Sequence, residues 1–580
     1  MLFSFSGYAH QRACLWKQKE RQSQIDSLPA IYSTPLSLSE EKIHALSISQ
    51  LVSRCRSGAI APSAVMMAYA KKTLVAQHAT NCVTDIMFDE SLSIPSVANW
   101  GPGVDSETQV TEAGTHDHSL LGVPVSIKDT VDIVGHDTTI GYSRNVARPA
   151  SASSAIVRLL QDAGALVHVK TTVPTGLLAL ETTSDIFGRT TNPYNPNHTA
   201  GASTGGGGAL VAYGGSKIEI GTDVGGSVRI PAHFCGIWSL KGSAGRFPMW
   251  GSSSSMMGLE GVPIVASPLA GNLVDLEEFW KRVVLSEPWR YDHTCVPMPW
   301  KFVNLQVEGR KLKWGIMWED GVIPPSPACR RALTMVASAL RKQGHEVVDF
   351  HPPNVFEGLK IAYQLLFADG GKQVASQLSP REAFGVSTSS ILDLLNLSRF
   401  VKKVLAFFTR SSDPISAEIY DIMHAKTIVE DRKLIAARDE YRARWHQKWT
   451  EDGLDFVLTV PHVLPALENG TSKQATLLSA GYTCIFSLLD YTAGVLPVTF
   501  VDKIVDALPK DFASTPQGKS LNGVAKGAFS VYDAEKMHGL PLGVQVAGRR
   551  LEEEKVLEGM KLIEAALREQ GTVFVPQVRM

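Results

Sequence analysis

The spacing of apolar and polar residues along the chain predicts alternating strands and helices. Val123 to Ile127 (VPVSI) is largely apolar, as expected for a strand buried on both faces. Residues 153–164 begin with serines and end at a glycine, which is the pattern of a helix, and Ala165 to Val169 follows as a second strand. A strand, a helix and a second strand in this order predict parallel pairing, and therefore the α/β class.

The same alternation continues in the C-terminal half of the chain. Residues 328–342 predict a helix that ends before Gly344, and residues 346–350 predict the strand after it. Residues 559–568 predict part of a C-terminal helix. Residues 510–527 are largely polar, and we expect a surface loop there. Because no repeat or domain-breaking linker interrupts the pattern, we expect a single domain over residues 1–580.

Two stretches nearer the N-terminus differ from this pattern. Residues 37–95 predict a helical region, in which Ser37 to Glu41 resembles a capped helix start. Residues 100–119 are polar and contain glycine, and they predict a mobile loop. The triplet His116-Asp117-His118 suggests a metal site, but no other ligands stand at a useful spacing, so we expect no metal there.

Residues 391–408 (ILDLLNLSRFVKKVLAFF) form the most hydrophobic stretch that we expect near the surface. Asp393, Arg399, Lys402 and Lys403 interrupt it, which indicates one or two amphipathic helices. Such helices either lie at a membrane interface or pack against the protein core. We favour the second interpretation, in which helices within about residues 380–410 cap a pocket.

Composition and charge exclude several classes of protein. The 580 residues are 44% hydrophobic and 19% charged, as in an ordinary globular protein with a sizeable core. A net charge of -1 argues against nucleic acid or an anionic membrane as the main partner. No run of 18 apolar residues occurs, so we expect no transmembrane anchor.

The cysteines and the N-terminus predict a cytoplasmic location. The seven cysteines are too few and too scattered for a disulfide framework, and no C-x-x-C pair occurs. The first 22 residues lack an apolar run of signal-peptide length. The glycosylation sequons at Asn197, Asn396 and Asn469 are then expected to be chance matches.

The candidate chemistry lies in a glycine-rich stretch, residues 199–231 (TAGASTGGGGALVAYGGSKIEIGTDVGGSVRIP). It holds two hydroxyl sites flanked by glycines, Ser203-Thr204 and Ser227. Glycine permits tight turns and leaves backbone N–H groups accessible. A hydroxyl on such a loop suits acyl transfer, because that reaction needs a nucleophile and donors for the developing oxyanion.

Other interpretations of this stretch fit less well. Glycine-rich segments are most often plain turns, but a phosphate loop of the form G-x-x-x-x-G-K-[ST] is absent. A nucleophile elbow, G-x-S-x-G, would need glycine where Arg229 stands. The serine loop has no local histidine, so its base must come from elsewhere.

A lysine is the candidate base. Lys128 ends the apolar run, and burial can lower the pKa of such an amine. The more common alternative is a solvated lysine or one paired with a carboxylate, here Asp129. Composition alone does not choose among Lys128, Lys170, Lys217 and Lys241.

Three motifs carry a resemblance to a known family. They are LGVPVSIKD (121–129), GASTGGGGAL (201–210) and GTDVGGSVRIPAHFCG (221–236), and together they closely resemble the core of the amidase signature family. Residues 188–196, 490–491 and 539–557 resemble its fungal acetamidase and general-amidase branch. The resemblance implies a large mixed central β-sheet covered by helices on both faces, with the catalytic core at about residues 120–250.

By this resemblance Lys128, Ser203 and Ser227 form the catalytic triad. Ser227 is the expected nucleophile, and Ser203 relays its proton to a neutral Lys128. The resemblance also implies a cis peptide bond between Ala202 and Ser203. We expect the Ser203 hydroxyl to lie within hydrogen-bonding distance of both partners.

The resemblance assigns further roles around the triad. The backbone N–H groups of Val224, Gly225, Gly226 and Ser227 are expected to form the oxyanion hole beside Ser203. Asp223 and Arg229 are expected to brace this loop as an ion pair, and Thr222 to bond near the substrate. Leu177 and Leu178 suggest an apolar acyl pocket.

The sequence departs from the usual family pattern at several positions. Ala202 replaces a glycine, and Thr204 replaces a second serine but keeps a hydroxyl for a supporting hydrogen bond. Gly207 stands where this branch often has glutamate, Thr172 where asparagine is usual, and Gly242 where proline is usual. None of these changes removes a catalytic group, so they bear on substrate preference and loop geometry.

The resemblance implies an enzyme that cleaves a carboxylic amide to an acid plus ammonia or an amine. It needs no cofactor, its partner is a small-molecule amide, and a homodimer is left open. One alternative is the glutaminase subunit of a transfer-RNA-dependent amidotransferase, which would need partner subunits. The other is an inactive amidase-like binding protein, against which the intact Lys128, Ser203 and Ser227 argue.

Overall fold

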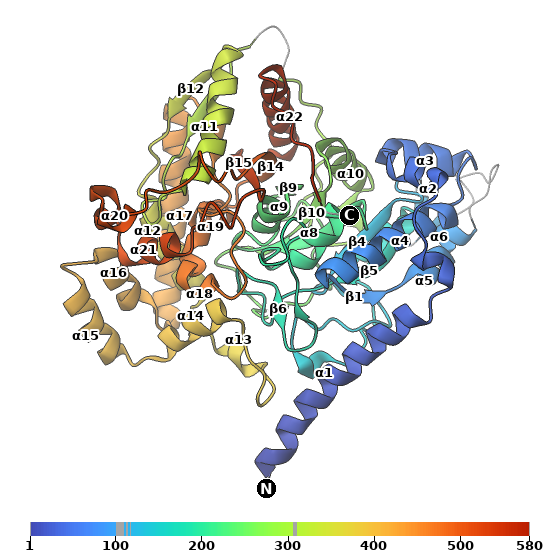
Figure 1. The fold of residues 1–580 in the computed structure, drawn as a ribbon, viewed down its shortest axis with the longest axis horizontal. Coiled ribbons are helices and arrows are strands. Elements are labelled where there is room, and N and C mark those ends of the chain that lie inside the picture. Colours follow the sequence, from blue (N-terminus) through green and yellow to red (C-terminus); the bar gives the residue numbers. More distant parts are fainter. Residues whose placement is uncertain (1, 100–109, 112–113, 116–117, 306–309, 579–580) are drawn as a thin grey trace.

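The computed structural model describes residues 2–99, 110–111, 114–115, 118–305 and 310–578 (Figure 1). Its centre is an 11-stranded sheet. From one edge to the other, the strands are β1 (Val83–Ile86), β5 (Leu166–Thr171), β4 (Pro124–Lys128), β8 (Ile218–Asp223), β10 (Val265–Ala270), β9 (Trp238–Lys241), β14 (Ala493–Phe500), β15 (Pro541–Ala547), β13 (Phe456–Thr459), β11 (Lys313–Ile316) and β12 (Glu346–Asp349).

The sheet is mixed, and its parallel part positions two candidate residues. β4 pairs in parallel with both β5 and β8, and α7 (Ala155–Asp162) connects β4 to β5 as the hydrophobic pattern predicted. Parallel strands bring their carboxyl ends to one edge of the sheet, where α/β proteins bind ligands. Lys128 is the last residue of β4 and Asp223 is the last residue of β8.

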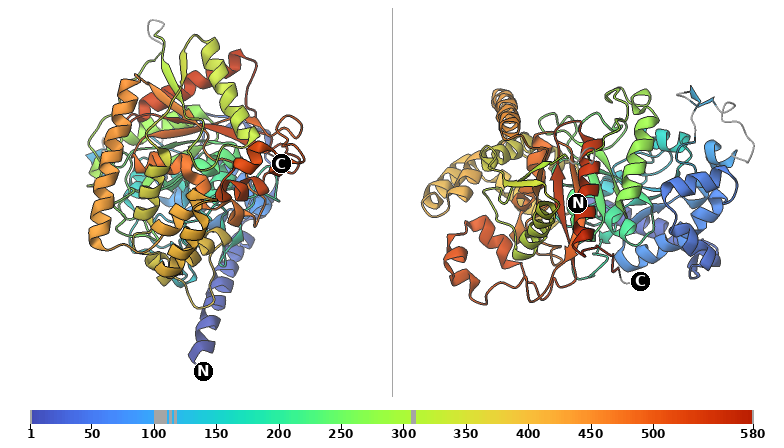
Figure 2. Two further views of the ribbon diagram at one scale, coloured as in Figure 1. Left: turned by 90° about the vertical axis from the view of Figure 1, so that its left-hand side faces the viewer. Right: turned by 90° about the horizontal axis from the view of Figure 1, so that it is seen from above.

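Helices cover both faces of the sheet (Figure 2). α8 (Gly205–Ala212) packs on the face to which Glu219 of β8 points. α10 (Leu273–Leu285) packs on the opposite face with the alternate residues Ile218 and Ile220. Among the described residues, the other helices around the sheet that have 12 residues or more are α4 (Pro62–Thr80), α11 (Pro327–Lys342), α12 (Val355–Leu366), α17 (Ile428–Glu451) and α22 (Glu553–Glu569).

The chain begins with a long helix that the hydrophobic pattern does not predict. α1 (Leu2–Asp26) extends away from the body of the molecule (Figure 1). Gln18, Arg21 and Gln24 in its C-terminal half bond to acceptors on Ile186 and β1. These contacts hold the helix to the sheet edge through polar groups, which leave little apolar periodicity in the sequence.

The predicted helical region follows α1. It contains α2 (Leu38–His44), α3 (Ile48–Arg56) and α4, and Ser37 and Glu40 form the predicted capping box at the start of α2. The metal motif considered above includes His116 and Asp117, which lie outside the described residues.

Residues 391–408 fold as two helices, α14 (Val386–Asn396) and α15 (Arg399–Thr409). The Lys402 amine is buried and donates to the carbonyl oxygens of Leu395 and Met423, while Phe400, Phe407 and Phe408 are exposed. That these helices cap a pocket stays a prediction. No helix among the described residues is long and apolar enough to cross a membrane.

The loop predicted at residues 510–527 is partly helical, so that prediction was wrong in part. It contains η7 (Phe512–Ser514) and α20 (Pro516–Ser520), and α21 (Gly523–Ser530) begins within it. The Thr515 side chain accepts a hydrogen bond from the Gly518 N–H, and Asn522 caps α21 in the same way. Single capping residues thus stabilise short helices in a segment whose composition is that of a loop.

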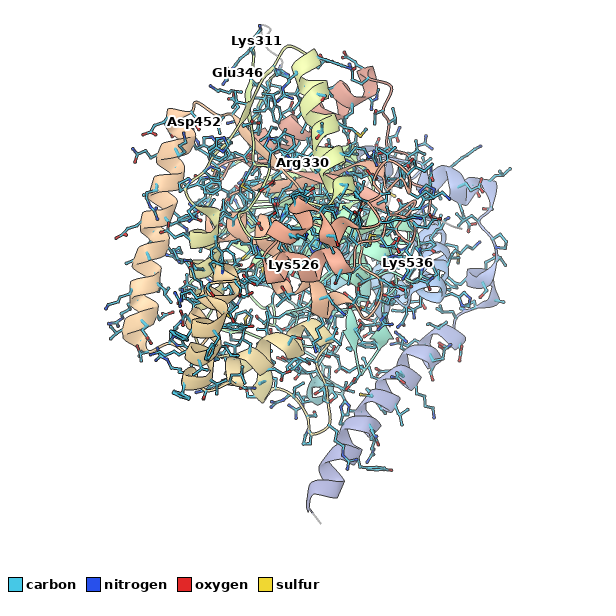
Figure 3. The ribbon with its side chains drawn as sticks, turned by 60° about the vertical axis from the view of Figure 1, so that its left-hand side comes forward. Lys311, Arg330, Glu346, Asp452, Lys526 and Lys536 are labelled. Atoms are coloured by element: carbon cyan, nitrogen blue, oxygen red, sulfur yellow. The ribbon has the colours of Figure 1, made fainter. Side chains whose placement is uncertain are left out.

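The surface and the interior agree with the composition. Charged side chains of both signs are spread over the surface, and Lys311, Arg330, Glu346, Asp452, Lys526 and Lys536 are among them (Figure 3). All seven cysteines are free and buried, as expected from their number and spacing. The interior therefore holds only reduced thiols.

Candidate active site

Lys128 projects from the end of β4 and is fully buried. Its Nζ lies 2.8 Å from Ser203 Oγ, 3.0 Å from Thr222 Oγ1 and 3.2 Å from the Thr222 carbonyl oxygen. Burial lowers the pKa of Lys128 to about 7, although Asp223 and Glu219 favour the charged form. At neutral pH a large share of this amine is therefore uncharged and able to accept a proton.

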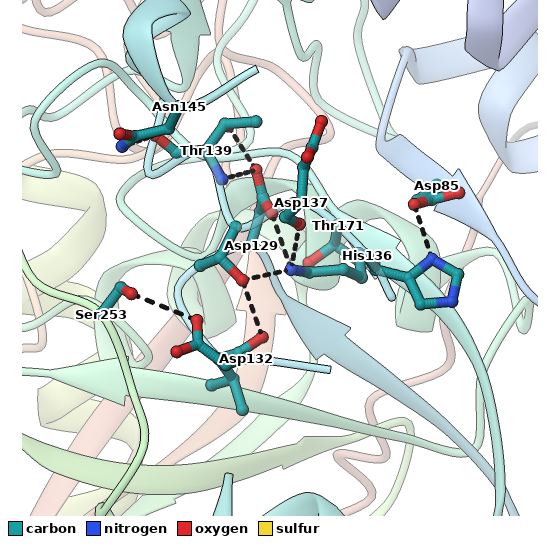
Figure 4. Close-up of polar contacts among 12 residues, drawn as sticks. Asp85, Asp129, Asp132, His136, Asp137, Thr139, Asn145, Thr171 and Ser253 are labelled. Carbon is teal, nitrogen blue, oxygen red and sulfur yellow. Dashed lines mark hydrogen bonds and ion pairs between the residues drawn. The ribbon is translucent and has the colours of Figure 1, made fainter. Parts of the chain in front are cut away.

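A second buried lysine lies on the neighbouring strand and has a different partner. Lys170 of β5 forms an ion pair with Asp129, with Nζ 3.1 Å from Oδ1, and donates to Thr138 Oγ1. Asp129 also accepts a hydrogen bond from the Thr139 backbone N–H (Figure 4). Asp129 is thus the partner of Lys170 and not of Lys128. In the described chain, Lys170 makes no hydrogen bond to the serine loop.

The other two candidate lysines also lie away from the serines. Lys217 forms an ion pair with Asp275, with 2.8 Å between Nζ and Oδ2. Lys241 donates to the carbonyl oxygens of Gly242 and Tyr491, each at 2.9 Å. Of the four lysines, Lys128 is the one that contacts Ser203.

Ser203 stands two residues before α8, next to its N-cap residue Thr204, and is 2% exposed. The Ala202–Ser203 peptide bond is cis, as predicted. The Thr204 N–H donates to the Ser227 carbonyl oxygen at 3.2 Å, which joins the two serine sites. Within the described residues no hydrogen bond links the Ser203 and Ser227 hydroxyls, so only the Lys128 half of the expected bridge is formed. Catalytic hydrogen bonds often close only when substrate is bound.

The loop that carries Ser227 is braced by a buried ion pair, as predicted. Arg229 contacts both carboxylate oxygens of Asp223, at 2.9 and 3.1 Å. Its other N–H groups donate to Thr483 O, Ser487 Oγ and Gln545 Oε1, each at 2.8 Å. Despite burial, Arg229 lowers the pKa of Asp223 to about 2, so the pair stays ionised.

The same carboxylate changes the expected set of oxyanion donors. The Gly226 N–H donates to Asp223 Oδ1 at 2.8 Å, so it is already engaged. The N–H groups of Val224, Gly225 and Ser227 have no hydrogen-bond partner in the part of the chain that is described. These three donors are therefore available to a ligand, and Gly226 shapes the loop with a φ of 134°.

A largely apolar cavity opens beside the serines. Ser203, Thr222 and residues 224–227 line it, and so do Leu177 and Leu178, as the sequence suggested. Further apolar side chains come from distant segments: Leu180, Ile230, Met249, Met256, Phe367 and Leu477. A nucleophile at an apolar wall suits a substrate with a hydrophobic group beside the reacting carbonyl.

Three site residues differ from their expected roles or were missed. Thr222 holds Lys128 through its hydroxyl and carbonyl oxygens in addition to lining the cavity. The Thr204 hydroxyl, expected to keep a supporting hydrogen bond, is buried without a partner among the described residues. Glu219 was missed, although an acidic residue between two isoleucines of a buried strand was a visible signal.

Comparison with known proteins agrees with this geometry. The amidase family model matches residues 64–557. An acetamidase of Aspergillus oryzae is 31% identical over 527 residues, which cover 90% of each chain. Fatty-acid amide hydrolase 1 of Sus scrofa is also 31% identical and covers 91% of this chain and 86% of its own. A solved structure of a fatty acid amide hydrolase has a TM-score of 0.81 at 25% identity, and covers 97% of this chain and 96% of its own.

The fold, the site and these relatives define a hydrolase that acts on amide bonds. The chain belongs to the amidase signature family, and its mixed sheet is the α/β fold of that family.

Proposed function

We propose that this protein is a cofactor-independent serine amidohydrolase whose catalytic residues are Lys128, Ser203 and Ser227. The observation that supports it best is the buried Lys128 amine, whose pKa of about 7 and 2.8 Å contact with Ser203 suit a general base. Ser227 lies on the braced loop in the wall of the same cavity. The contact of Ser203 with Lys128 supports its proposed role as the relay between the base and the nucleophile.

The reaction begins when Ser227 Oγ attacks the carbonyl carbon of the amide. Its proton passes to Ser203, and the Ser203 proton passes to Lys128 Nζ. The carbonyl oxygen becomes an oxyanion, which the N–H groups of Val224, Gly225 and Ser227 stabilise.

Collapse of this intermediate breaks the carbon–nitrogen bond. Lys128 returns its proton through Ser203 to the leaving nitrogen, so ammonia or an amine departs and Ser227 holds an acyl ester. Water then attacks the ester carbonyl, and the same relay accepts its proton. Return of that proton to Ser227 Oγ releases the carboxylic acid and restores the enzyme.

The cavity supports an apolar acyl or aryl group on the substrate. Leu177, Leu178 and Phe367 are poor partners for the polar side chain of glutamine, so they argue against the glutaminase alternative. With purified single chain, we expect kcat/KM to rise from acetamide to longer aliphatic amides and anilides, with little turnover of glutamine. A clear preference for glutamine would contradict this assignment.

The nucleophile is tested by substitution and covalent labelling. We expect Ser227→Ala to abolish amide hydrolysis and to leave Tm nearly unchanged, since Ser227 is only partly buried. A fluorophosphonate probe should label Ser227, as located by peptide mass spectrometry. Ser253→Ala, which changes another serine of the cavity wall, is the matched control and should still be labelled. Labelling of Ser203 together with full activity of Ser227→Ala would refute the proposed roles.

A further inference from the structure

Glu219 is a fully buried carboxyl group that the proposed mechanism does not use. It lies in β8, where the Thr171 hydroxyl donates to its Oε1 at 2.6 Å. Its Oε2 is buried and has no hydrogen-bond partner among the described residues. An unsatisfied buried carboxyl oxygen destabilises the folded state, so the position of Glu219 calls for a physical explanation.

The register of the strands places Glu219 beside the candidate base. Ser126 of β4 pairs with Glu219, and Lys128 pairs with Thr171 of β5. Paired residues and alternate residues share one face of a sheet, so these four side chains lie on the same face. The hydrogen bond from Thr171 to Glu219 therefore crosses β4 on the side from which Lys128 projects.

The helix above this face has no side chain where Glu219 lies. A Cβ atom at Gly207 of α8 would be 2.2 Å from Glu219 Cδ and 2.3 Å from its Cγ and Oε1. Real Cβ atoms do not approach other atoms so closely, so Glu219 fills the space that a side chain at position 207 would need. Position 207 is also the one where glycine departs from the glutamate often present in the resembling branch.

We propose that Glu219 is a positioning residue for Lys128. In this way β8 supplies a buried carboxyl group at the place where α8, with glycine at position 207, has no side chain. The proposal rests on the proposed role of Lys128 as the base. A protonated Glu219 leaves the amine of Lys128 free to lose its proton, whereas an ionised Glu219 holds that proton on the amine. Glu219 thus sets the pH at which the serine relay becomes active.

The charges around the pair are compatible with this role. Burial raises the pKa of Glu219 to about 7, although the neighbouring hydroxyls of Ser126 and Thr171 and the charge of Lys128 act in the opposite direction. Burial also raises the pKa of Cys82 to about 12, so that neighbour stays neutral. Asp223, which acts on Lys128 from the end of β8, stays ionised beside Arg229. α8 has no titratable side chain, and Leu269 of β10 pairs with Glu219.

The first experiment compares pH profiles of Ser227 labelling by a fluorophosphonate, which needs no knowledge of the substrate. Glu219→Gln keeps the size of the side chain but cannot ionise. We expect the acidic limb of its labelling rate to move to lower pH by at least half a unit. Asp320→Asn is the matched control, because burial raises the pKa of Asp320 to about 7 as well, and its profile should not move. An unchanged profile in Glu219→Gln would overturn the proposal.

The second experiment removes the carboxyl group from β8 and supplies one from α8 instead. Glu219→Ala removes the side chain that positions Lys128 as well as its charge, so we expect it to lower the maximal labelling rate, on the alkaline side of the profile, at least tenfold. The double variant Gly207→Glu/Glu219→Ala should recover at least half of this rate. The double variant Gly207→Ala/Glu219→Ala fills space without a carboxyl and should not recover. Equal recovery by both double variants, at equal Tm, would show that packing alone matters. If Glu219→Ala does not fold, the Gln profile decides.

These experiments separate the role of Glu219 from the proposed function. Failure of the unmodified protein to label at Ser227 would contradict both proposals. Normal labelling of the unmodified protein with an unmoved Glu219→Gln profile would contradict the role of Glu219 alone.

Discussion

Lys128 has to be uncharged to accept a proton, and the fold achieves this by removing its amine from water. The pKa of the unfolded side chain is 10.5 and that of the buried amine is about 7. Between these values the unfolded state binds more protons than the folded state. The free energy of unfolding should therefore rise as the pH rises from about 7 towards 10.5, through this residue. The burial that suits Lys128 to its proposed role as base thus lowers the stability of the fold near neutral pH.

Lys128→Met tests both parts of this argument at the residue scale. Methionine fills a similar volume without a charge, so we expect it to raise Tm at pH 7 and to reduce kcat by several orders of magnitude. In the unmodified enzyme, kcat should increase with pH around a midpoint near 7, as the amine loses its proton. Lys519→Met changes an exposed lysine and should alter neither quantity. Full activity of Lys128→Met would transfer the role of base to another residue.

At the scale of elements, the site depends on the turn between β8 and α9 (Arg229–Cys235). The Asp223 carboxylate accepts the N–H groups of Gly226 and Val228, which curls the chain around Ser227. Arg229 then joins this turn to α19 (Gly481–Leu488) and β15, far away in the sequence. The planar fork of five donors is what allows one side chain to make all of these contacts.

Arg229→Lys keeps the charge and removes the fork. We expect the free energy of unfolding to fall by about 3–5 kcal/mol, as when a buried pair is broken, because several buried acceptors lose their donor. The kcat of the protein that remains folded should fall as well, since the loop that carries Ser227 is less well held. Chemical denaturation and single-turnover acylation measure the two effects. Arg444→Lys changes an exposed pair with Glu357 and is the control, expected to cost under about 1 kcal/mol.

At the scale of the whole molecule, a second buried network joins α22, near the C-terminus, to the segment that follows β9. Glu553 at the start of α22 is fully buried, and its carboxylate accepts from the Ser243 N–H, the Thr492 hydroxyl and Arg246 Nε. Arg246 also pairs with Glu554. The strands β9 and β14 lie beside these residues, so the network joins segments that are more than 300 positions apart.

Glu553→Ala should therefore destabilise the whole fold without changing the rate of acylation. We expect a loss of about 3–5 kcal/mol in the free energy of unfolding, because Arg246 loses one of its carboxylate partners in a buried site. The rate of acylation per folded molecule should stay within twofold of the unmodified protein. Glu558→Ala removes a carboxylate on the same helix that pairs with Lys561, and should cost no more than about 1 kcal/mol. Equal stability of the two variants would contradict the importance of the network.

Local patterns predicted the elements whose residues carry their own signal. β4 was predicted to within one residue at each end, because its largely apolar run and the Gly122 before it are local features. α20 was missed, since one capping threonine is a weak signal. The three partners of Arg229 beyond Asp223 and the position of Glu219 under Gly207 follow only from tertiary packing, so spacing along the chain could not show them.

The reactivity of the buried cysteines can report local opening and unfolding of this enzyme. Since all seven thiols are free and shielded, a soluble aromatic disulfide reagent should react slowly with the native protein and with seven equivalents once it unfolds. Cys235 lies at the end of α9, which follows the turn that carries Ser227, and Cys484 lies in α19, to which Arg229 bonds, whereas Cys14 lies on the protruding α1. The order in which the thiols are modified would therefore map which regions loosen first, without any added label.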